Sequence, residues 1–262
     1  MYAVILAGAE GISGTGEMSY KAGLSLGNDT MLGKVIDVVS KIKSVERIVV
    51  VGAESLLKEK ERKKVWRIIA PSQSFFTNLE QGILSIPGEE EVLVVASDLP
   101  LITSQACTDF ITQCRSRQAD VYYPVIPKEL YENAYPGSER TYIKLSDGVY
   151  TGGNMVLMKP SFFRRHRRLI RLAINLRKRP WILALRFGFG FWWKFARKSL
   201  TINDIEEMFR KKYKFRGATI ISNYSELGFD IDSQEDLNWI RFYWAGIRDG
   251  WKRELERDEW LM

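Results

Sequence analysis

Three aspartates have the residue type and spacing expected of a metal site. Asp98 lies in residues 97–100 (SDLP), directly after the apolar run 92–96. Asp230 and Asp232 alternate further along, and alternation places both side chains on one face of an extended segment. Carboxylate oxygens are the ligands that Mg²⁺ prefers. The three aspartates are therefore candidate ligands for one cation, although a turn or a helix cap also accounts for Asp98.

A glycine-rich loop follows the first apolar run. Residues 2–7 (YAVILA) lead into residues 8–21 (GAEGISGTGEMSYK), which hold four glycines and end at Lys21. Glycine lets backbone amides approach a phosphate closely, and the lysine supplies positive charge. The loop is not a P-loop, because Gly-Lys-Ser/Thr is absent, and it does not match GxGxxG. By spacing alone it is either a phosphate loop or a surface loop.

A second glycine pair precedes an asparagine in residues 151–154 (TGGN). Two glycines permit close backbone contact with a ligand, and Asn154 can both donate and accept a hydrogen bond. A hairpin turn is the alternative interpretation.

The rare residues exclude several chemistries. The only histidine, His166, stands between pairs of arginines, where neighbouring cations disfavour the imidazolium. A His/Cys zinc site and Ser-His-Asp catalysis are therefore not expected. Cys107 and Cys114 lie seven residues apart in a predicted helix, roughly 10 Å along its axis. This exceeds the separation of about 7 Å that a disulfide spans, so we expect free thiols and a reducing cytoplasm.

Length and composition indicate an ordinary globular protein. The chain has 262 residues, of which 45% are hydrophobic and 27% charged. These values exclude a disordered, collagen-like or disulfide-stapled protein. No signal peptide is expected at the N-terminus. The most apolar stretch, 181–195, contains Arg186 and Lys194 and is shorter than the roughly 20 residues of a membrane span.

Strand and helix patterns alternate over the first half of the chain. We predict strands at 2–7, 47–52, 92–96 and 120–126, and helices at 30–43, 77–86 and 104–118. This alternation predicts an α/β protein with a mainly parallel sheet, whose site lies beyond the carboxyl ends of the strands. Prolines then indicate irregular chain after residue 127. The remaining predicted elements are strands at 140–145, 150–158 and 216–221, a helical and basic stretch at 160–214, and helices within 233–260.

Five segments, taken in this order, resemble the MobA-like NTP transferase family of the GT-A-type nucleotidyltransferase superfamily. They are Leu6-Ala7-Gly8, Lys21-Ala22, Ser97-Asp98-Leu99-Pro100, Gly152-Gly153-Asn154, and 230–237 (DIDSQEDL). The resemblance implies a Rossmann-like three-layer α/β/α fold with a mainly parallel mixed sheet. The basic helical insert at 160–214 is similar to that of an uncharacterised bacterial branch.

The resemblance also implies one domain over 1–262. Residues 1–127 would form its nucleotide-binding half and 128–237 its acceptor-binding half, with C-terminal helices at 238–262. The implied reaction moves NMP from an NTP onto a phosphorylated small-molecule acceptor and releases pyrophosphate, with Mg²⁺ or Mn²⁺. The implied catalytic residues are Lys21, Asp98 and Asp230, and the implied metal ligands are Asp98, Asp230 and Asp232.

The remaining implied site residues contact the two substrates. The nucleotide would be contacted by Leu6, Ala7, Gly8, Ala9, Gly11, Ser74, Thr77, Asn78 and Ser97. The acceptor would be contacted by Arg140, Gly152, Gly153 and Asn154. One departure from the family pattern is that the loop lacks its usual arginine and carries Glu10 and Glu17. Arg140 or Lys144 could replace it.

Two other functions stay open. A GT-A glycosyltransferase that consumes a nucleotide sugar would use the same sheet and a metal-binding carboxylate. A non-catalytic nucleotide-binding, membrane-peripheral protein would explain the missing arginine. The acceptor is also open among a pterin, a sugar phosphate and a lipid-linked phosphate, and the chain is expected to be a monomer or homodimer.

The positive charge is concentrated in one stretch. Of the formal charge of +7, residues 148–203 contribute 13 basic and no acidic side chains, which leaves −6 on the rest. Tryptophans and phenylalanines are mixed with these cations. A solvated basic helix packed on the sheet, a membrane-surface contact through 160–200, a lid over an anionic substrate and a dimer contact all fit this pattern. Nucleic acid is not favoured, because no recognised binding motif is present. We expect a cytoplasmic protein, with the membrane surface as an alternative location.

Overall fold

The structure is a computed structural model. It describes residues 1–8, 10–12, 18–26, 29–176, 182, 186–233, 235–240 and 243. Ala9, the loop residues 13–17 and most of the predicted C-terminal helices lie outside the described residues.

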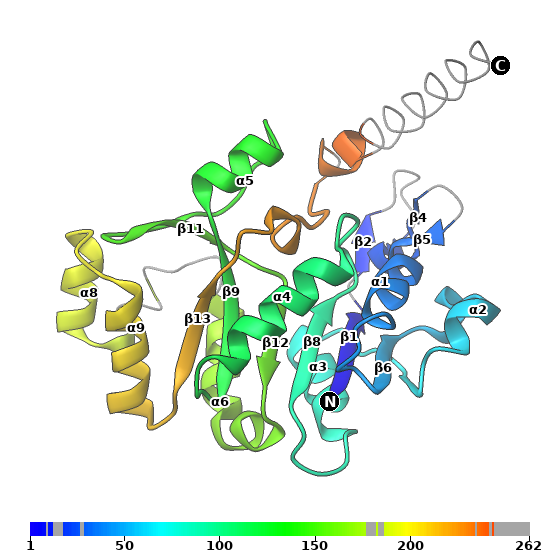
Figure 1. Cartoon of the computed structure of the whole chain (residues 1–262), viewed down its shortest axis with the longest axis horizontal. Helices are drawn as coiled ribbons and strands as arrows, with labels where there is room; N and C mark the ends of the chain where they lie inside the picture. The colour runs from blue at the N-terminus through cyan, green and yellow to red at the C-terminus, as the bar shows by residue number, and fades with distance from the viewer. Residues whose placement is uncertain are drawn as a thin grey trace.

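Nine strands of the described chain form one mixed sheet (Figure 1). Their order is β10-β11-β9-β12-β8-β1-β6-β7, and β13 also pairs with β9. The strands β7, β6, β1 and β8 are parallel neighbours, β12 runs antiparallel between β8 and β9, and β13 is parallel to β9. The strand bounds are β1 (Tyr2–Ala7), β6 (Arg47–Gly52), β7 (Arg67–Ile69), β8 (Val92–Ala96), β9 (Val121–Pro127), β10 (Ile143–Leu145), β11 (Gly148–Gly152), β12 (Met155–Met158) and β13 (Gly217–Ile221).

Helices cover both faces of this sheet. The described α-helices are α1 (Met31–Val39), α2 (Glu59–Arg62), α3 (Phe75–Leu84), α4 (Ser104–Arg115), α5 (Lys128–Ala134), α6 (Pro160–Leu176), α8 (Phe189–Ala196) and α9 (Ile202–Met208). Short hairpins form from β2 (Glu10–Ile12) with β3 (Met18–Tyr20), and from β4 (Ser25–Leu26) with β5 (Asp29–Thr30).

The central strand shows why the fold has three layers. Every residue of β1 is buried. Ala3 and Ile5 belong to the core formed with α1 and α4. Tyr2 and Val4 belong to the core formed with α3 and α6. Because side chains alternate across a strand, an apolar run without alternation requires a packed layer on each face. The predicted three-layer α/β/α fold with a mainly parallel mixed sheet is confirmed.

Capping residues set the helix starts. The side chains of Thr30, Ser74 and Thr103 accept hydrogen bonds from backbone amides in the first turns of α1, α3 and α4. Such capping satisfies amides that have no partner within the helix. As a result α3 begins two residues before the predicted start. The helices α1 and α4 end earlier than predicted.

The chain after residue 127 differs from the expectation of irregular structure. Residues 128–134 form α5, with Pro127 at its N-cap position. Proline is tolerated at the start of a helix, because the amide it lacks would have no partner in the helix. The short strand β7 and helix α2 are also absent from the sequence prediction. In the stretch 160–214, the structure describes α6, α8, α9 and a π-helical turn at Phe209–Tyr213, whereas residues 177–181 and 183–185 lie outside the described residues.

Both cysteines are free, as predicted, and the structure shows that both are buried. Burial raises the pKa of each thiol to about 12, so both stay protonated. Among the described residues, no helix combines the length and apolar character needed to cross a membrane.

Gly82 allows α3 to lie against the sheet. A Cβ at this position would lie 2.5 Å from Val4 Cγ1 and 3.1 Å from Val51 Cγ2. We expect Gly82→Ala to lower the free energy of unfolding by roughly 1–3 kcal/mol, because overpacking outweighs the gain in helix propensity. Urea unfolding measures the change. The matched control is Gly190→Ala in α8, where nothing lies within 4 Å; it should be neutral or stabilising by up to about 1 kcal/mol. Equal effects of the two substitutions would contradict this account of α3 packing.

Candidate active site

The ends of three parallel strands meet at one edge of the sheet. Leu6 of β1 pairs with Ala96 of β8, and Ala7 pairs with Gly52 of β6. The segments that follow β1, β6 and β8 therefore leave the sheet side by side, as predicted. Asp98 lies two residues beyond β8. The preceding Ser97 is buried, and its amide donates to the Leu6 carbonyl at 3.2 Å.

The second aspartate segment reaches this edge from the far end of the chain. It follows β13 and a 3-10 turn at Ser225–Leu227. The amide of Ile231 donates to the Asp98 carbonyl at 3.3 Å. The amide of Asn154 donates to the Leu227 carbonyl at 2.8 Å, and its side-chain Nδ2 donates to the Gly228 carbonyl at 3.4 Å. Asn154 thus fixes the position of the turn that precedes Asp230 and Asp232.

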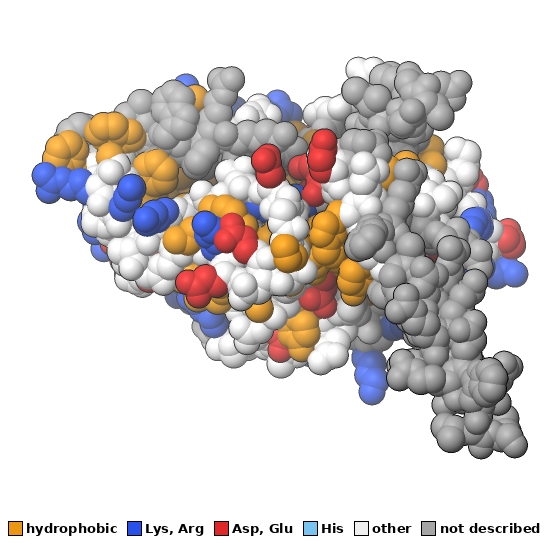
Figure 2. Space-filling model, turned by 90° about the horizontal axis from the view of Figure 1, so that it is seen from above, with side chains coloured by type: hydrophobic (Ala, Val, Ile, Leu, Met, Phe, Trp, Pro, Cys, Tyr) orange, Lys and Arg blue, Asp and Glu red, His pale blue; other side chains and the backbone are white. Residues whose placement is uncertain are grey.

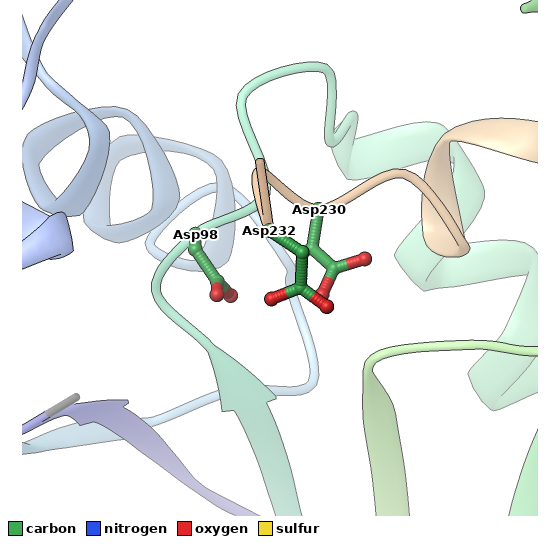
Figure 3. A group of neighbouring side chains, drawn as sticks. All are labelled: Asp98, Asp230 and Asp232. Atoms are coloured by element: carbon green, nitrogen blue, oxygen red, sulfur yellow. The ribbon is translucent and has the colours of Figure 1, made fainter. Parts of the chain in front are cut away.

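Asp98, Asp230 and Asp232 form an acidic cluster. One carboxylate oxygen of each lies within 4.8 Å of those of the other two. In Figure 3 the three side chains extend from two neighbouring segments toward a common space. Asp98 and Asp230 are partly buried, whereas Asp232 is exposed. Three oxygen donors at this spacing can hold a hard divalent cation.

The electrostatics of the cluster favour added positive charge. Burial, reinforced by the charge of Asp230, raises the pKa of Asp98 to about 7. Burial also raises the pKa of Asp230, although the guanidinium of Arg140 opposes this effect. Raised pKa values mean that the positive groups of the protein do not fully balance the negative charge of the two ionised carboxylates.

Lys21 provides positive charge beside the cluster. Its Nζ donates to the Ile231 carbonyl at 3.0 Å and to Asp232 Oδ1 at 3.1 Å. Lys21 begins a 3-10 turn that is anchored by the buried Ala22. The lysine predicted at the end of the glycine-rich loop therefore does lie with the predicted metal ligands.

Arg140 contacts the cluster rather than open solvent. Its side chain is 8% exposed and forms an ion pair with Asp230, which is 15% exposed. Nη2 donates to the Asp230 carbonyl at 2.5 Å, and Nε donates to the hydroxyl of Tyr131 at 2.7 Å. Each of the three guanidinium nitrogens therefore already has a hydrogen-bond partner in the protein. Arg140 thus fixes the position of Asp230, and its predicted contact with an acceptor stays a prediction.

A polar network lies behind the cluster. The Tyr131 hydroxyl lies 3.2 Å from Ser138 Oγ, which donates to Asp236 Oδ1 at 3.2 Å. Asp236 Oδ2 in turn accepts from the amides of Asp232 and Ser233 at 3.1 and 3.0 Å. The spacing of Ser233 and Asp236 is the signal for this cap, because a serine followed three residues later by an acid is typical of a helix start. No local signal identifies Tyr131, whose helix was not predicted.

The two glycines of the predicted acceptor segment serve the protein backbone. A Cβ on Gly153 would lie 2.9 Å from Pro124 Cγ and 3.3 Å from the Leu227 carbonyl. A Cβ on Gly152 would lie 2.2 Å from the Tyr123 hydroxyl. In the pairing with β9, Gly152 of β11 is opposite Val125, and Leu157 of β12 is opposite Tyr122. The segment that runs from β11 into β12 therefore holds two more residues between these pairs than β9 does. The glycines thus mark a bulge rather than a hairpin turn.

The predicted nucleotide residues lie in three places. Leu6 and Ala7 are buried in β1, and Gly8 follows them. A Cβ on Gly8 would lie 2.5 Å from Asn78 Nδ2. The side-chain amide of Asn78 hydrogen-bonds to the neighbouring loop. Its Oδ1 accepts from the Ser72 amide at 2.7 Å, and its Nδ2 donates to the Ser72 carbonyl at 3.0 Å.

The other nucleotide candidates lie at the start of α3, in β2 or outside the described residues. Ser74 is exposed at the start of α3, and Thr77 lies in its first turn. Gly11 lies in β2. Ala9 and Glu17 lie outside the described residues.

A separate hollow of about 440 Å³ lies at the opposite edge of the sheet. Its lining mixes basic with acidic side chains, including Arg117, Asp120 and Lys159. Arg117 is already paired with Glu206 at 2.5 Å. The acidic cluster, not this hollow, is therefore the candidate active site.

The fold is similar to that of solved transferases and nucleotidyltransferases. A hypothetical transferase from Thermus thermophilus superposes with a TM-score of 0.78 at 28% identity, over 90% of this chain and 98% of that one. The 4-diphosphocytidyl-2C-methyl-D-erythritol synthase of Anaerococcus prevotii gives a TM-score of 0.54 at 16% identity, over 92% and 94%. A CMP:2-keto-3-deoxy-manno-octonic acid synthetase in complex with CTP gives 0.56 at 10% identity, over 94% and 98%. At these lower identities the likeness concerns the fold alone.

A family model adds sequence support. The MobA-like NTP transferase domain matches residues 3–182, so the chain belongs to the MobA-like NTP transferase family, as the sequence analysis predicted. No curated protein matches the chain. The matched region contains Lys21, Asp98 and Arg140 but ends before Asp230 and Asp232.

The buried ion pair predicts a stability effect. Arg140→Ala leaves Asp230 partly buried without its guanidinium, and we expect a loss of roughly 3 kcal/mol in the free energy of unfolding. Arg62→Ala is the matched control, because Arg62 pairs with Glu54 at the surface and both side chains are at least half exposed. That variant should lose less than about 1 kcal/mol. Chemical unfolding of both variants measures the difference, and a similar small loss in each would show that Arg140 is not needed to compensate Asp230.

The raised pKa of Asp98 predicts how stability depends on pH. Its ordinary pKa is 3.8, and in the fold the pKa is about 7. The folded state therefore holds a proton that the unfolded chain releases, so the contribution to stability is complete below pH 4 and is lost as the pH rises through 7. In EDTA at pH 8, Asp98→Asn should raise the free energy of unfolding by roughly 1–3 kcal/mol, with little difference at pH 5.

Metal addition provides the complementary measurement. Mn²⁺ should stabilise the wild-type chain at pH 8 more than at pH 5.5, because protons compete for the carboxylates. It should not stabilise Asp98→Asn. An equal Mn²⁺ effect at both pH values, or in the variant, would place the bound ion elsewhere.

Proposed function

We propose that this chain is a Mg²⁺- or Mn²⁺-dependent nucleotidyltransferase that moves NMP from an NTP onto a phosphorylated small-molecule acceptor and releases pyrophosphate. The observation that supports this reaction is the acidic cluster beside Lys21 at the carboxyl edge of the sheet. Membership of the NTP transferase family supports the nucleotide as the donor.

The donor set fits a hard divalent cation. Asp98, Asp230 and Asp232 offer oxygen atoms only, and no histidine or cysteine belongs to the group. Oxygen donors select Mg²⁺ or Mn²⁺ over zinc or copper. When bound, the cation would supply positive charge against the phosphates.

The chain's own residues would hold the reacting groups in place. Lys21 would contribute positive charge, and Arg140 would keep Asp230 in position. In the proposed transfer, an oxygen of the acceptor phosphate forms a bond to the α-phosphorus. The bond from the α-phosphorus to the bridging oxygen breaks, and its electron pair leaves with pyrophosphate. The acceptor phosphate is already anionic, so alignment and charge compensation suffice without a strong base.

We assign the two substrates to the two halves of the chain. The nucleotide would lie along residues 1–127, with Gly8, Gly11, Ser74 and Thr77 nearest to it. The acceptor would lie along residues 128–237, on the side of Asn154.

The reaction is tested by pyrophosphate release. The chain is mixed with each of the four NTPs, Mg²⁺, and a panel of sugar, alditol and lipid-linked phosphates. CTP is tried first, because one structure with this fold holds CTP. Asp98→Asn should lower the rate of release by at least roughly 100-fold, since it removes a charge on which alignment and compensation depend. Glu59→Gln is the matched control: it also removes one negative charge, but from a side chain that is 76% exposed on α2.

Three outcomes would contradict the proposal. Pyrophosphate release that survives in Asp98→Asn would remove that residue from the cation site. Turnover of a nucleotide sugar without pyrophosphate would indicate a glycosyltransferase. Tight NTP binding without turnover across the whole panel would indicate a nucleotide-binding protein.

A further inference from the structure

The helix α8 has an inner and an outer side. Phe191 and Phe195 pack against a small core formed by Leu145, Tyr150 and Leu200. Residues four apart lie on one face of a helix, so this pair anchors α8 to the β10–β11 end of the sheet. The opposite face, with Trp193 and Arg197, therefore points away from the sheet.

The outer side combines aromatic and basic groups. Trp193 is 44% exposed, and the Arg197 guanidinium lies 4.5 Å from its ring centroid. Lys198 follows Arg197 directly and is exposed. We call Trp193, Arg197 and Lys198 the α8 patch. Figure 2 shows hydrophobic and basic side chains next to each other at this end of the molecule.

The α8 patch keeps its positive charge. The acidic side chains of the adjacent α9 are each committed to a basic partner: Asp204 to Lys194 at 2.8 Å, Glu206 to Arg117 at 2.5 Å, and Glu207 to Arg210 at 2.6 Å. Within the described parts of the chain, neither Arg197 nor Lys198 forms an ion pair with a carboxylate. The nearest acids on either side in sequence have other partners: Asp204 pairs with Lys194, and Asp147 accepts from the Ile202 amide at 2.9 Å.

We propose that the α8 patch docks the protein on an anionic membrane surface. Tryptophan is favoured at the bilayer interface, where its ring is buried and its N–H stays hydrated. Basic residues near an anionic bilayer are attracted by its negative surface potential. The α8 patch has both features, because it combines an exposed tryptophan with cations that have no carboxylate partner. This docking is independent of the proposed reaction, because the acidic cluster is not part of the patch.

Two other occupants fit the patch less well. In a symmetric dimer the same patch meets itself, so an α8–α8 contact would bring the cations together. Proteins that bind single-stranded nucleic acid use a basic groove along the strand. α8 lies instead at one end of the molecule (Figure 1), and its residues line neither described hollow.

The test is flotation of the full chain with vesicles. Vesicles of equal phosphatidylcholine and phosphatidylglycerol should bind the wild-type chain, and vesicles of phosphatidylcholine alone should bind it at least tenfold less. Arg197→Glu with Lys198→Glu should lower the partition coefficient at least tenfold. The matched control is Lys41→Glu with Lys43→Glu, which makes the same charge change at exposed lysines after α1 and should bind like wild type.

The aromatic contribution is tested separately. Trp193→Ala should lower binding at least threefold at 0.5 M NaCl, where attraction between charges is screened. Circular dichroism and thermal unfolding show that each variant is folded. Pyrophosphate release should be unchanged in the variants designed to lose vesicle binding. Failure of docking and failure of the proposed reaction are therefore distinguishable.

Several results would overturn the docking proposal. These are no flotation of the wild-type chain with anionic vesicles, and equal loss in the two double variants. Tighter binding to a single-stranded oligonucleotide than to vesicles would assign the patch to nucleic acid. A dimer in solution that Arg197→Glu with Lys198→Glu dissociates would assign it to a second copy.

Discussion

The central constraint on this structure is the repulsion between carboxylates that are partly buried at one edge of a sheet. Asp98 and Asp230 both have raised pKa values because burial disfavours their charged forms. Two ion pairs offset part of the cost of burying these charges: Arg140 pairs with Asp230, and Lys21 pairs with Asp232. Each of these cations is directed at a residue in the 230–232 segment. Among the described residues, Asp98 forms no ion pair, so of the three proposed ligands it has the least compensation from the protein.

The sheet positions these charges through close backbone contacts. Asp98 lies where β8 ends, and its carbonyl accepts from Ile231. The bulge at Gly152 and Gly153 lets the turn at Ser225–Leu227 approach the sheet, because any side chain at Gly153 would meet the Leu227 carbonyl. The same glycines that resemble a family motif thus have a structural reason in this chain. Their effect on the acidic cluster is indirect, through the position of the turn that precedes Asp230.

Much of the fold follows from local sequence patterns. The strands at 2–7, 47–52 and 92–96 were predictable because, apart from the exposed Arg47, they are apolar runs that the sheet buries on both faces. The grouping of Asp98 with Asp230 and Asp232 was expected from the alternation of the two later aspartates and from the family resemblance. The ion pair of Arg140 with Asp230 could not be predicted, because it joins residues 90 positions apart without a local pattern. The helix α5 was missed because prolines around it favoured irregular chain.

The distance in sequence between the carboxylates has a consequence for synthesis of the protein. Asp98 is followed by more than a hundred residues before Asp230 appears, and β13, which leads to it, pairs with β9 in the middle of the sheet. A nascent chain that has emerged from the ribosome as far as residue 182 spans the whole region matched by the family model. It nevertheless lacks two of the three carboxylates and the strand that positions them. The acidic cluster, which is the proposed cation site, is therefore completed only late in translation, after the parallel strands that support it are already available to fold.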